Sequence, residues 1–190
     1  NPGATAVDLS QVYLTDATYA PGGVFYYNIV TGTSAGGGGF SDFHARFPQG
    51  ASIAPGGYQT IAMDGAAFQV AYGIEPTYEL YDTLAGVADM AEALPGSINR
   101  QGGLTNSGEV AILYRWDGLS DRVSDLDYLV WGDKNEAVDK TGVAIDGPDG
   151  DAVATSYLAD TAVSDQVAVA PGGHAFGQSW QRADLAEGAE

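Results

Sequence analysis

The sequence contains no cysteine, only two histidines, and no apolar run that approaches the length of a membrane-spanning helix. Without cysteine there is neither a disulfide framework nor a thiolate metal site. A helix needs about 20 consecutive apolar residues to cross a bilayer, so we expect no membrane span. A zinc site built on two histidines would need carboxylates as its other ligands, which is uncommon for a structural site.

Basic residues are also scarce: seven Lys and Arg stand against 25 Asp and Glu, and the formal net charge is −18. Affinity for nucleic acid comes largely from cations that displace the counterions of the phosphate backbone. This chain has no basic surface for that role, so we expect no nucleic-acid binding. An acidic surface keeps a protein soluble, and it can also collect divalent cations or a basic partner.

Glycine and apolar residues, by contrast, are abundant: 27 of the 190 residues are glycine and 45% are hydrophobic. The length suits a single domain, residues 1–190, with enough apolar surface to offset the entropy of ordering the chain. Much glycine with few charged residues favours short strands joined by turns. The chain begins at Asn1 with no targeting segment, so we expect a processed form or a part of a longer protein.

The tetrapeptide Ala-Pro-Gly-Gly occurs three times, at residues 20–23, 54–57 and 170–173. Proline presets the first central position of a type II turn, and the next glycine supplies the positive φ of the second. Short strands between turns, without regular strand–helix alternation, indicate an all-β antiparallel sandwich. The predicted strands cover residues 7–14, 24–30, 40–47, 58–63, 67–72, 109–116, 126–131, 156–158 and 179–185.

One short helix is predicted over residues 84–94. Val87, Met90 and Leu94 recur there at helical spacing, and Pro95-Gly96 follows as a stop signal.

In residues 41–47, a period of two places His44 and its charged neighbours on the solvent face, opposite Phe43 and Phe47. A relay from His44 to a nucleophile is an alternative, but Ser41 points to the other face. A row of exposed charged groups is the favoured interpretation.

Six short phrases follow one another in order over nearly the whole chain: Asn1-Pro-Gly-Ala-Thr-Ala-Val-Asp-Leu-Ser10, Tyr13-Leu14-Thr15-Asp16, Phe47-Pro48 with Ile53-Ala54-Pro55-Gly56-Gly57-Tyr58, Leu104-Thr105-Asn106-Ser107-Gly108-Glu109-Val110, Asp127-Tyr128-Leu129-Val130-Trp131-Gly132, and Gly177-Gln178-Ser179-Trp180-Gln181-Arg182. Together they resemble the signatures of the lamin tail domain family. No single phrase is diagnostic; their shared order makes the resemblance specific.

The resemblance implies an immunoglobulin-like β-sandwich. Bacterial members occur in exported proteins, often beside nucleases, phosphatases or other hydrolases, and are not known as catalysts. It therefore implies an extracellular, cell-surface or periplasmic location.

The sequence departs from the family in two places. Family members usually begin with a further hairpin before the Asn-Pro-Gly turn, and the sheet edge left open without it could pair with a partner or a second copy. Residues 64–103 form an insertion where a short link is expected, and this insertion holds the predicted helix.

The best metal candidate is the acidic loop from Asp146 to Asp151. Asp146, Asp149 and Asp151 could converge their carboxylate oxygens on a hard cation such as Ca²⁺. The EF-hand pattern fails, because the acid spacing differs and the closing glutamate is missing. A solvated acidic turn is the alternative.

A second acidic group, Asp121, Asp125 and Asp127, could supply a glycosidase-like pair of carboxylates. The sequence does not fix their separation, and Asp127 belongs to a family phrase. We therefore expect no catalytic residues, no enzyme activity and no cofactor beyond Ca²⁺.

The first functional hypothesis is a non-catalytic recognition, attachment or structural module of an exported bacterial protein, which binds a protein or surface partner. The alternatives are a Ca²⁺-dependent glycan- or peptide-binding domain, an accessory domain of a secreted hydrolase or nuclease, and a hydrolase that uses Asp125 or Asp127.

Overall fold

The computed structural model describes residues 1–18, 24–36, 42–100, 103–175 and 177–182. Strands far outnumber helices in these residues, so the prediction of a mostly-β protein is confirmed. The elements are β1 (Val7–Asp8), β2 (Val12–Thr15), the 3-10 helix η1 (Tyr26–Thr31), β3 (His44–Arg46), β4 (Ser52–Ile53), β5 (Ile61–Ala62), α1 (Gly65–Tyr72), β6 (Tyr78–Glu79), β7 (Ala88–Asp89), β8 (Ala91–Glu92), β9 (Gly108–Arg115), β10 (Ser124–Gly132), β11 (Ala144–Ile145) and β12 (Thr155–Ser156).

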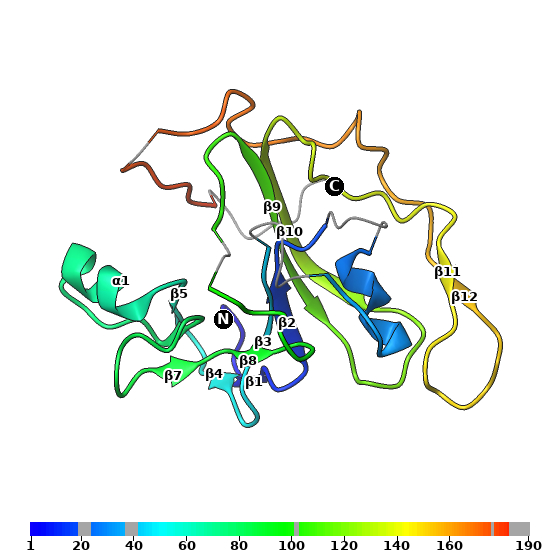
Figure 1. The fold of residues 1–190 in the computed structure, drawn as a ribbon, viewed down its shortest axis with the longest axis horizontal. Helices are drawn as coiled ribbons and strands as arrows, with labels where there is room; N and C mark the ends of the chain where they lie inside the picture. The colour runs from blue at the N-terminus through cyan, green and yellow to red at the C-terminus, as the bar shows by residue number, and fades with distance from the viewer. Residues whose placement is uncertain (19–23, 37–41, 101–102, 176, 183–190) are drawn as a thin grey trace.

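The largest sheet has five antiparallel strands in the order β10-β9-β2-β3-β8 (Figure 1). Its two long strands, β9 and β10, confirm the strands predicted at residues 109–116 and 126–131. The β10–β9 register shifts between Asp125 and Asp127, which marks a β-bulge near the start of β10.

Apolar side chains cover both faces of this sheet. On one face, Val110, Ile112 and Tyr114 of β9 pack with the buried residues of η1. On the other, Val12 of β2 packs with a second cluster that includes Tyr78. Figure 1 shows η1 on one side of the sheet and the strands β5 and β7 on the other. The sheet is therefore the middle layer of the molecule, and polar residues on it can be buried on either face.

Three smaller sheets surround it. β1 pairs with β4 and β11 with β12, both antiparallel, whereas β5, β6 and β7 form a parallel sheet. The helix α1 lies between β5 and β6 in sequence, as the crossover that parallel strands require.

The predicted turn at residues 54–57 is confirmed. Gly57 N donates to Ala54 O at 2.9 Å, and Gly56 has a φ of 67°, as a type II turn demands. At residues 170–173 the same tetrapeptide also turns, with a bond from Gly173 N to Ala170 O at 2.7 Å. The copy at 20–23 falls outside the described residues.

The helix predicted over residues 84–94 is wrong: this segment carries β7 and β8. Gly86 has a φ of 97°, which interrupts a helix. Met90 is buried in the second cluster and its N–H donates to Glu79 O at 2.7 Å, so strand pairing on both sides overrides the weak helical spacing.

The strand predicted over residues 67–72 is also wrong, because α1 spans Gly65–Tyr72. Asp64 caps it by accepting a hydrogen bond from Ala67 N, and Gly73 ends it at a φ of 70°. Residues 64–103, the predicted insertion, do contain one short α-helix, but at the beginning of the segment.

Two further strand predictions fail. Residues 24–30 form η1 instead, whose side chains Tyr26, Tyr27, Ile29 and Val30 are all buried, so no alternation marks the segment. Residues 179–182, the described part of the last predicted strand, carry none.

Of the helices in the described ranges, none is both long and apolar enough to cross a membrane.

Candidate functional site

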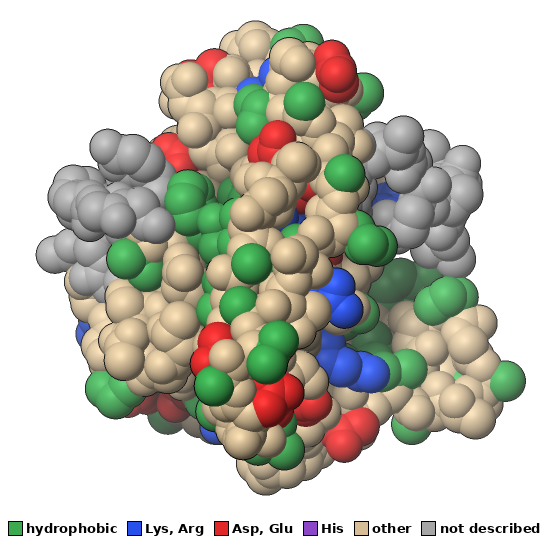
Figure 2. All heavy atoms as spheres, turned by 90° about the vertical axis from the view of Figure 1, so that its right-hand side faces the viewer, with side chains coloured by type: hydrophobic (Ala, Val, Ile, Leu, Met, Phe, Trp, Pro, Cys, Tyr) green, Lys and Arg blue, Asp and Glu red, His purple; other side chains and the backbone are tan. Residues whose placement is uncertain are grey.

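A pocket of about 640 Å³ opens beside the bulged start of β10. Its walls come from residues 120–125, Lys140, Asp149, Thr155 and residues 157–160. β11 and β12 lie on the side of the molecule that Figure 2 turns toward the viewer, where acidic, basic and apolar side chains are interspersed. The pocket volume lies within the roughly 300–1,000 Å³ range of small-ligand sites.

A partly buried ion-pair group forms one wall of the pocket. Lys140 Nζ lies 2.5 Å from Asp125 Oδ2 and 3.4 Å from Asp160 Oδ2, and it donates to Tyr26 OH at 3.1 Å. Tyr26 OH donates to the same Asp125 oxygen at 2.8 Å. Asp125 Oδ1 is buried without a hydrogen-bond donor among the described residues.

The charge states of this group are fixed by its surroundings. Burial works to lower the pKa of Lys140, but the carboxylates of Asp125 and Asp160 outweigh it and hold the pKa above its ordinary value. Burial, then the charge of Asp125, holds the pKa of Tyr26 well above its ordinary value. The amine therefore stays charged and the phenol stays neutral at physiological pH.

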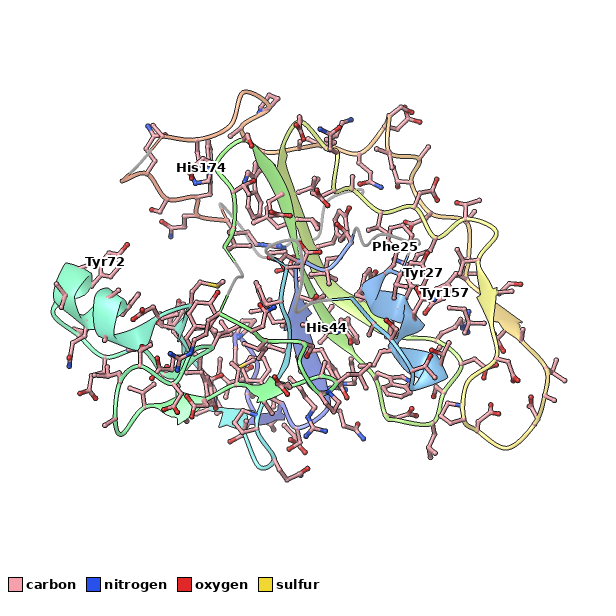
Figure 3. The ribbon with its side chains drawn as sticks, in the orientation of Figure 1. Phe25, Tyr27, His44, Tyr72, Tyr157 and His174 are labelled. Atoms are coloured by element: carbon pink, nitrogen blue, oxygen red, sulfur yellow. The ribbon has the colours of Figure 1, made fainter. Side chains whose placement is uncertain are left out.

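Tyr157 gives the pocket an aromatic surface. Its ring lies 5.9 Å from that of Tyr27, which stacks on Phe25 at 5.3 Å, and Figure 3 shows these three side chains together. Burial raises the pKa of Tyr157 to about 12, although a hydrogen bond from Val123 N opposes the shift. The ring sits beside donors and acceptors, as in sites that bind amphipathic polar ligands.

An acidic group lies at this pocket. One carboxylate oxygen each of Asp121, Asp146 and Asp149 lie within 4.8 Å of one another, and Asp121 and Asp149 line the pocket. Three oxygens at this spacing could ligate a hard cation. Of the three residues predicted for a metal, Asp146 and Asp149 are brought together, whereas Asp151 instead accepts a hydrogen bond from Val153 N at 2.7 Å.

Asp121 was predicted only as a member of the second acidic group and not as a possible metal ligand. It is buried, and it accepts from Thr155 Oγ1 at 2.5 Å and from Gly147 N at 2.8 Å. These two bonds lower its pKa, the Thr155 hydroxyl first. A Cβ at Gly147 would lie 2.9 Å from Asp121 Cα, so glycine lets the acidic loop approach this closely.

The second predicted acidic group is divided among different partners. Asp121 joins the loop, Asp125 pairs with Lys140, and the exposed Asp127 pairs with Arg182. Lys140 was also missed as a site residue. It is one of only two lysines in a chain of net charge −18, and that scarcity was the available signal.

Neither histidine lines the pocket. His44 is fully buried, so its predicted place on a solvent face is wrong: Nε2 lies 2.5 Å from Tyr114 OH and Nδ1 2.8 Å from Ala35 O (Figure 3). Burial lowers its pKa to about 4, which keeps the ring neutral. Ser41, its sequence neighbour, falls outside the described residues. The ring of His174 lies 6.3 Å from that of Trp131.

Comparison with protein-family models, with curated proteins and with solved structures gave no match. The fold and the site thus define a mostly-β protein with a polar, aromatic-walled pocket.

Proposed function

We propose that this protein is a non-catalytic recognition module whose pocket binds a glycan, with its hydroxyl-rich edge on Asp125, Lys140 and Asp160 and its apolar face on Tyr157. The observation that carries the proposal is the combination of fixed donors and acceptors with an aromatic ring in one pocket. A sugar presents hydroxyl groups at its edge and C–H groups on its faces, which matches both kinds of surface.

Binding is favoured over catalysis by the protonation states of the lining groups. A general acid or base works best with a pKa near the operating pH. The pKa values of Lys140 and Tyr157, which line the pocket, are raised from values that already lie well above neutrality. The pKa of Tyr26, which is buried and hydrogen-bonds to Lys140 and Asp125, is raised in the same way. Each group then keeps its proton, which suits a binding role.

The test is isothermal titration of the protein with a panel of neutral and acidic oligosaccharides. We expect at least one to bind, and Tyr157→Ala to weaken that binding about tenfold, because ring contacts at hot spots are worth more than about 1.4 kcal/mol. Tyr58→Ala is the matched control, since Tyr58 is 95% exposed and does not line the pocket. Equal affinity of Tyr157→Ala and wild type, or turnover of a bound glycan, would sink the proposal.

Calcium dependence is the second candidate function, and the observation that favours it is the convergence of Asp121, Asp146 and Asp149 at the same pocket. A cation bound to the native state must raise its melting temperature. Thermal melts with millimolar CaCl₂ should therefore show a rise that Asp149→Asn removes and Asp151→Asn retains. No rise in the wild-type protein would eliminate calcium and leave the glycan proposal standing.

We infer that the architecture is an immunoglobulin-like sandwich of the lamin-tail type, in an exported bacterial protein. What supports it is the ordered set of family phrases, together with a five-stranded antiparallel sheet. A crystal structure tests the fold: an immunoglobulin-like sandwich requires a second sheet packed on the first, with the strand order of that fold. Fractionation of the source cells tests the location.

A further inference from the structure

A tyrosine and a histidine form a hydrogen-bonded pair against the five-stranded sheet. His44 of β3 and Tyr114 of β9 come from the two strands that flank β2, and the strand register places both on the same face as Tyr13. Both side chains are fully buried, and Tyr114 OH lies 2.5 Å from His44 Nε2. Neither residue lines the pocket, so the pair is separate from the proposed glycan site.

The hydrogen-bond partners determine which atoms of this pair carry protons. Ala35 O, which lies 2.8 Å from His44 Nδ1, can only accept, so Nδ1 carries the proton of the neutral ring. Nε2 is then an acceptor, and the Tyr114 hydroxyl donates to it. Burial lowers the pKa of His44 to about 4 and, as the largest cause, raises the pKa of Tyr114 well above its ordinary value. In the resting protein the proton therefore stays on Tyr114, with a basic nitrogen as its acceptor.

A series of tyrosine rings joins this pair to the pocket. The ring centroid of Tyr26 lies 5.4 Å from that of Tyr114 and 5.5 Å from that of Tyr27. The Tyr27 ring lies 5.9 Å from that of Tyr157, which lines the pocket, and Figure 3 shows these two side chains next to each other. Tyr26, like Tyr114, is fully buried with its hydroxyl donating to a base, here Asp125 Oδ2 at 2.8 Å. Tyr26, Tyr27 and Tyr157 are named the tyrosine path below.

We propose that Tyr114 and His44 form a buried one-electron oxidation site, which the tyrosine path connects to an oxidant at the pocket. The oxidant is a high-potential one-electron acceptor of the class of oxygen-derived radicals. Tyrosine is among the side chains that such an acceptor can oxidise, and the rings of the path follow one another in contact from the core to the pocket.

The atoms and electrons of this step balance. Tyr114 loses one electron, and the oxidant gains it. The O–H bond of Tyr114 breaks and its proton forms an N–H bond at His44 Nε2, which leaves a neutral tyrosyl radical beside an imidazolium cation. Each ring of the tyrosine path gives up one electron and regains one, so all three end unchanged. The proton moves along a hydrogen bond that is already formed, as efficient proton transfer requires.

Flash photolysis of the whole chain tests the site. The oxidant is a ruthenium(III) polypyridyl complex, generated by a laser flash with a cobalt(III) ammine as the irreversible electron acceptor. This cation is drawn to a chain of net charge −18. Electron paramagnetic resonance of freeze-quenched samples should show a long-lived neutral tyrosyl radical, because Tyr114 is shielded from solvent. Tyr114→Phe should lose this radical and leave only short-lived ones at exposed tyrosines; an unchanged spectrum would overturn the proposal.

His44→Gln tests the proton acceptor. Glutamine can still accept from the Tyr114 hydroxyl and donate to Ala35 O, but its amide is too weak a base to take the proton. The long-lived radical should be lost, while thermal melts verify that the variant folds. Double resonance on the wild-type radical needs no variant: it should show coupling to an exchangeable proton, lost after prolonged exchange into D₂O. Wild-type radical yield in His44→Gln, or no such coupling, would refute this role of His44.

Tyr27→Phe tests the tyrosine path, because it keeps an aromatic ring in place and removes the hydroxyl that makes the ring oxidisable. The long-lived radical should form more slowly than in the wild type. Tyr58→Phe is the matched control and should change nothing, since Tyr58 is 95% exposed and lies outside the path. Equal rates in Tyr27→Phe and wild type would eliminate the path. Glycans take no part in these measurements, so a failure of the glycan proposal leaves their outcome unaffected.

Discussion

Two carboxyl groups in this protein have almost no solvent-accessible surface but have opposite pKa shifts. Glu79, in the β5–β7 sheet, is fully inaccessible, and Asp16, just after β2, is 1% exposed. Burial works to raise the pKa of both. Hydrogen bonds from the Thr83 side chain and from three backbone N–H groups overcome it at Glu79, whose pKa is lowered. At Asp16 burial prevails and the pKa rises to about 8.

The two sites differ in depth and in the number of donors: Asp16 lies deep in the protein, whereas Glu79 lies close to the surface although it is not accessible to solvent. Glu79 accepts bonds from Gly65 N, Thr83 N, Thr83 Oγ1 and Leu84 N, at 2.6 to 2.9 Å. Asp16 Oδ1 accepts one bond, from Phe43 N at 2.7 Å, and Oδ2 is buried with none. A buried carboxyl keeps its charge where donors replace its hydration, and otherwise keeps its proton.

The surroundings of Asp16 increase the contrast, because its charged neighbours are also acids. Asp42 precedes β3 and Glu109 is the second residue of β9, and these two strands pair with β2. Burial first, and then neighbouring carboxylates that include Glu136, raise the pKa of each to about 7. Glu136 itself accepts a bond from Thr18 Oγ1 at 2.9 Å. One end of the sheet thus gathers several carboxyl groups.

Removing the Glu79 carboxylate should cause the largest loss of stability. Glu79→Ala leaves three backbone N–H donors without an acceptor at the point where α1 joins the sheet, while the Thr83 hydroxyl can still donate to Asp64 Oδ1. The free energy of unfolding should therefore fall by about 3 kcal/mol or more. Urea denaturation measures it. Glu75→Gln is the control, since its exposed carboxylate should contribute within about 0.5 kcal/mol. A change of similar size in both would show that the buried network does not stabilise the protein.

At Asp16 we expect the opposite effect: removal of the carboxyl charge should increase the free energy of unfolding. In the unfolded chain it releases its proton near its ordinary pKa of 3.8, but in the folded protein near 8. Between these values the folded state holds a proton that the unfolded state has lost. The free energy of unfolding therefore falls as pH rises through this window, by up to about 1.4 kcal/mol per pH unit for each such group. Asp42 and Glu109 act in the same direction up to about pH 7.

We expect the melting temperature to fall between pH 5 and 8, and Asp16→Asn to flatten this fall and to stabilise the protein at pH 8 by about 1–2 kcal/mol. The amide can still accept from Phe43 N. Asp165→Asn, at an exposed carboxylate, should leave the wild-type profile unchanged. A profile that rises with pH, or one that Asp16→Asn leaves parallel to wild type, would refute the raised pKa.

Some elements of this fold could be predicted from the sequence and others could not. The long strands β9 and β10 were predictable because β-branched and aromatic residues fill them. The helix α1 carried its own signals, Asp64 before it and Gly73 after it, but its apolar residues read as a strand. Residues 84–94 were predicted as a helix and instead form strands, because segments of this stretch pair with Glu79 and with β3.

The candidate site was predictable only where it is local in sequence. Asp146 and Asp149 share a loop, so their convergence could be foreseen, whereas Asp121 joins them through a tertiary contact at Gly147. The burial of Glu79 could not be foreseen either. A lone glutamate between Tyr78 and Leu80 suggests a solvent face, and its donors come from residues on both sides in the chain.

A substitution at Gly65 tests the smallest change to the hydrogen-bond network of Glu79 and its donors. It alters the space around the carboxylate but leaves the charge of the carboxylate in place. A Cβ at Gly65 would lie 2.7 Å from Glu79 Oε2, closer than side chains tolerate. Gly65→Ala must displace the carboxylate from at least one donor, and we expect a loss of about 1 kcal/mol, reduced by the better helix propensity of alanine. Gly103→Ala, where a Cβ would meet no atom within 4 Å, should be nearly neutral. If both substitutions are neutral, the Glu79 carboxylate and its donors can shift without a loss of stability. The presence of the donors, and not their rigid placement, would then keep Glu79 charged.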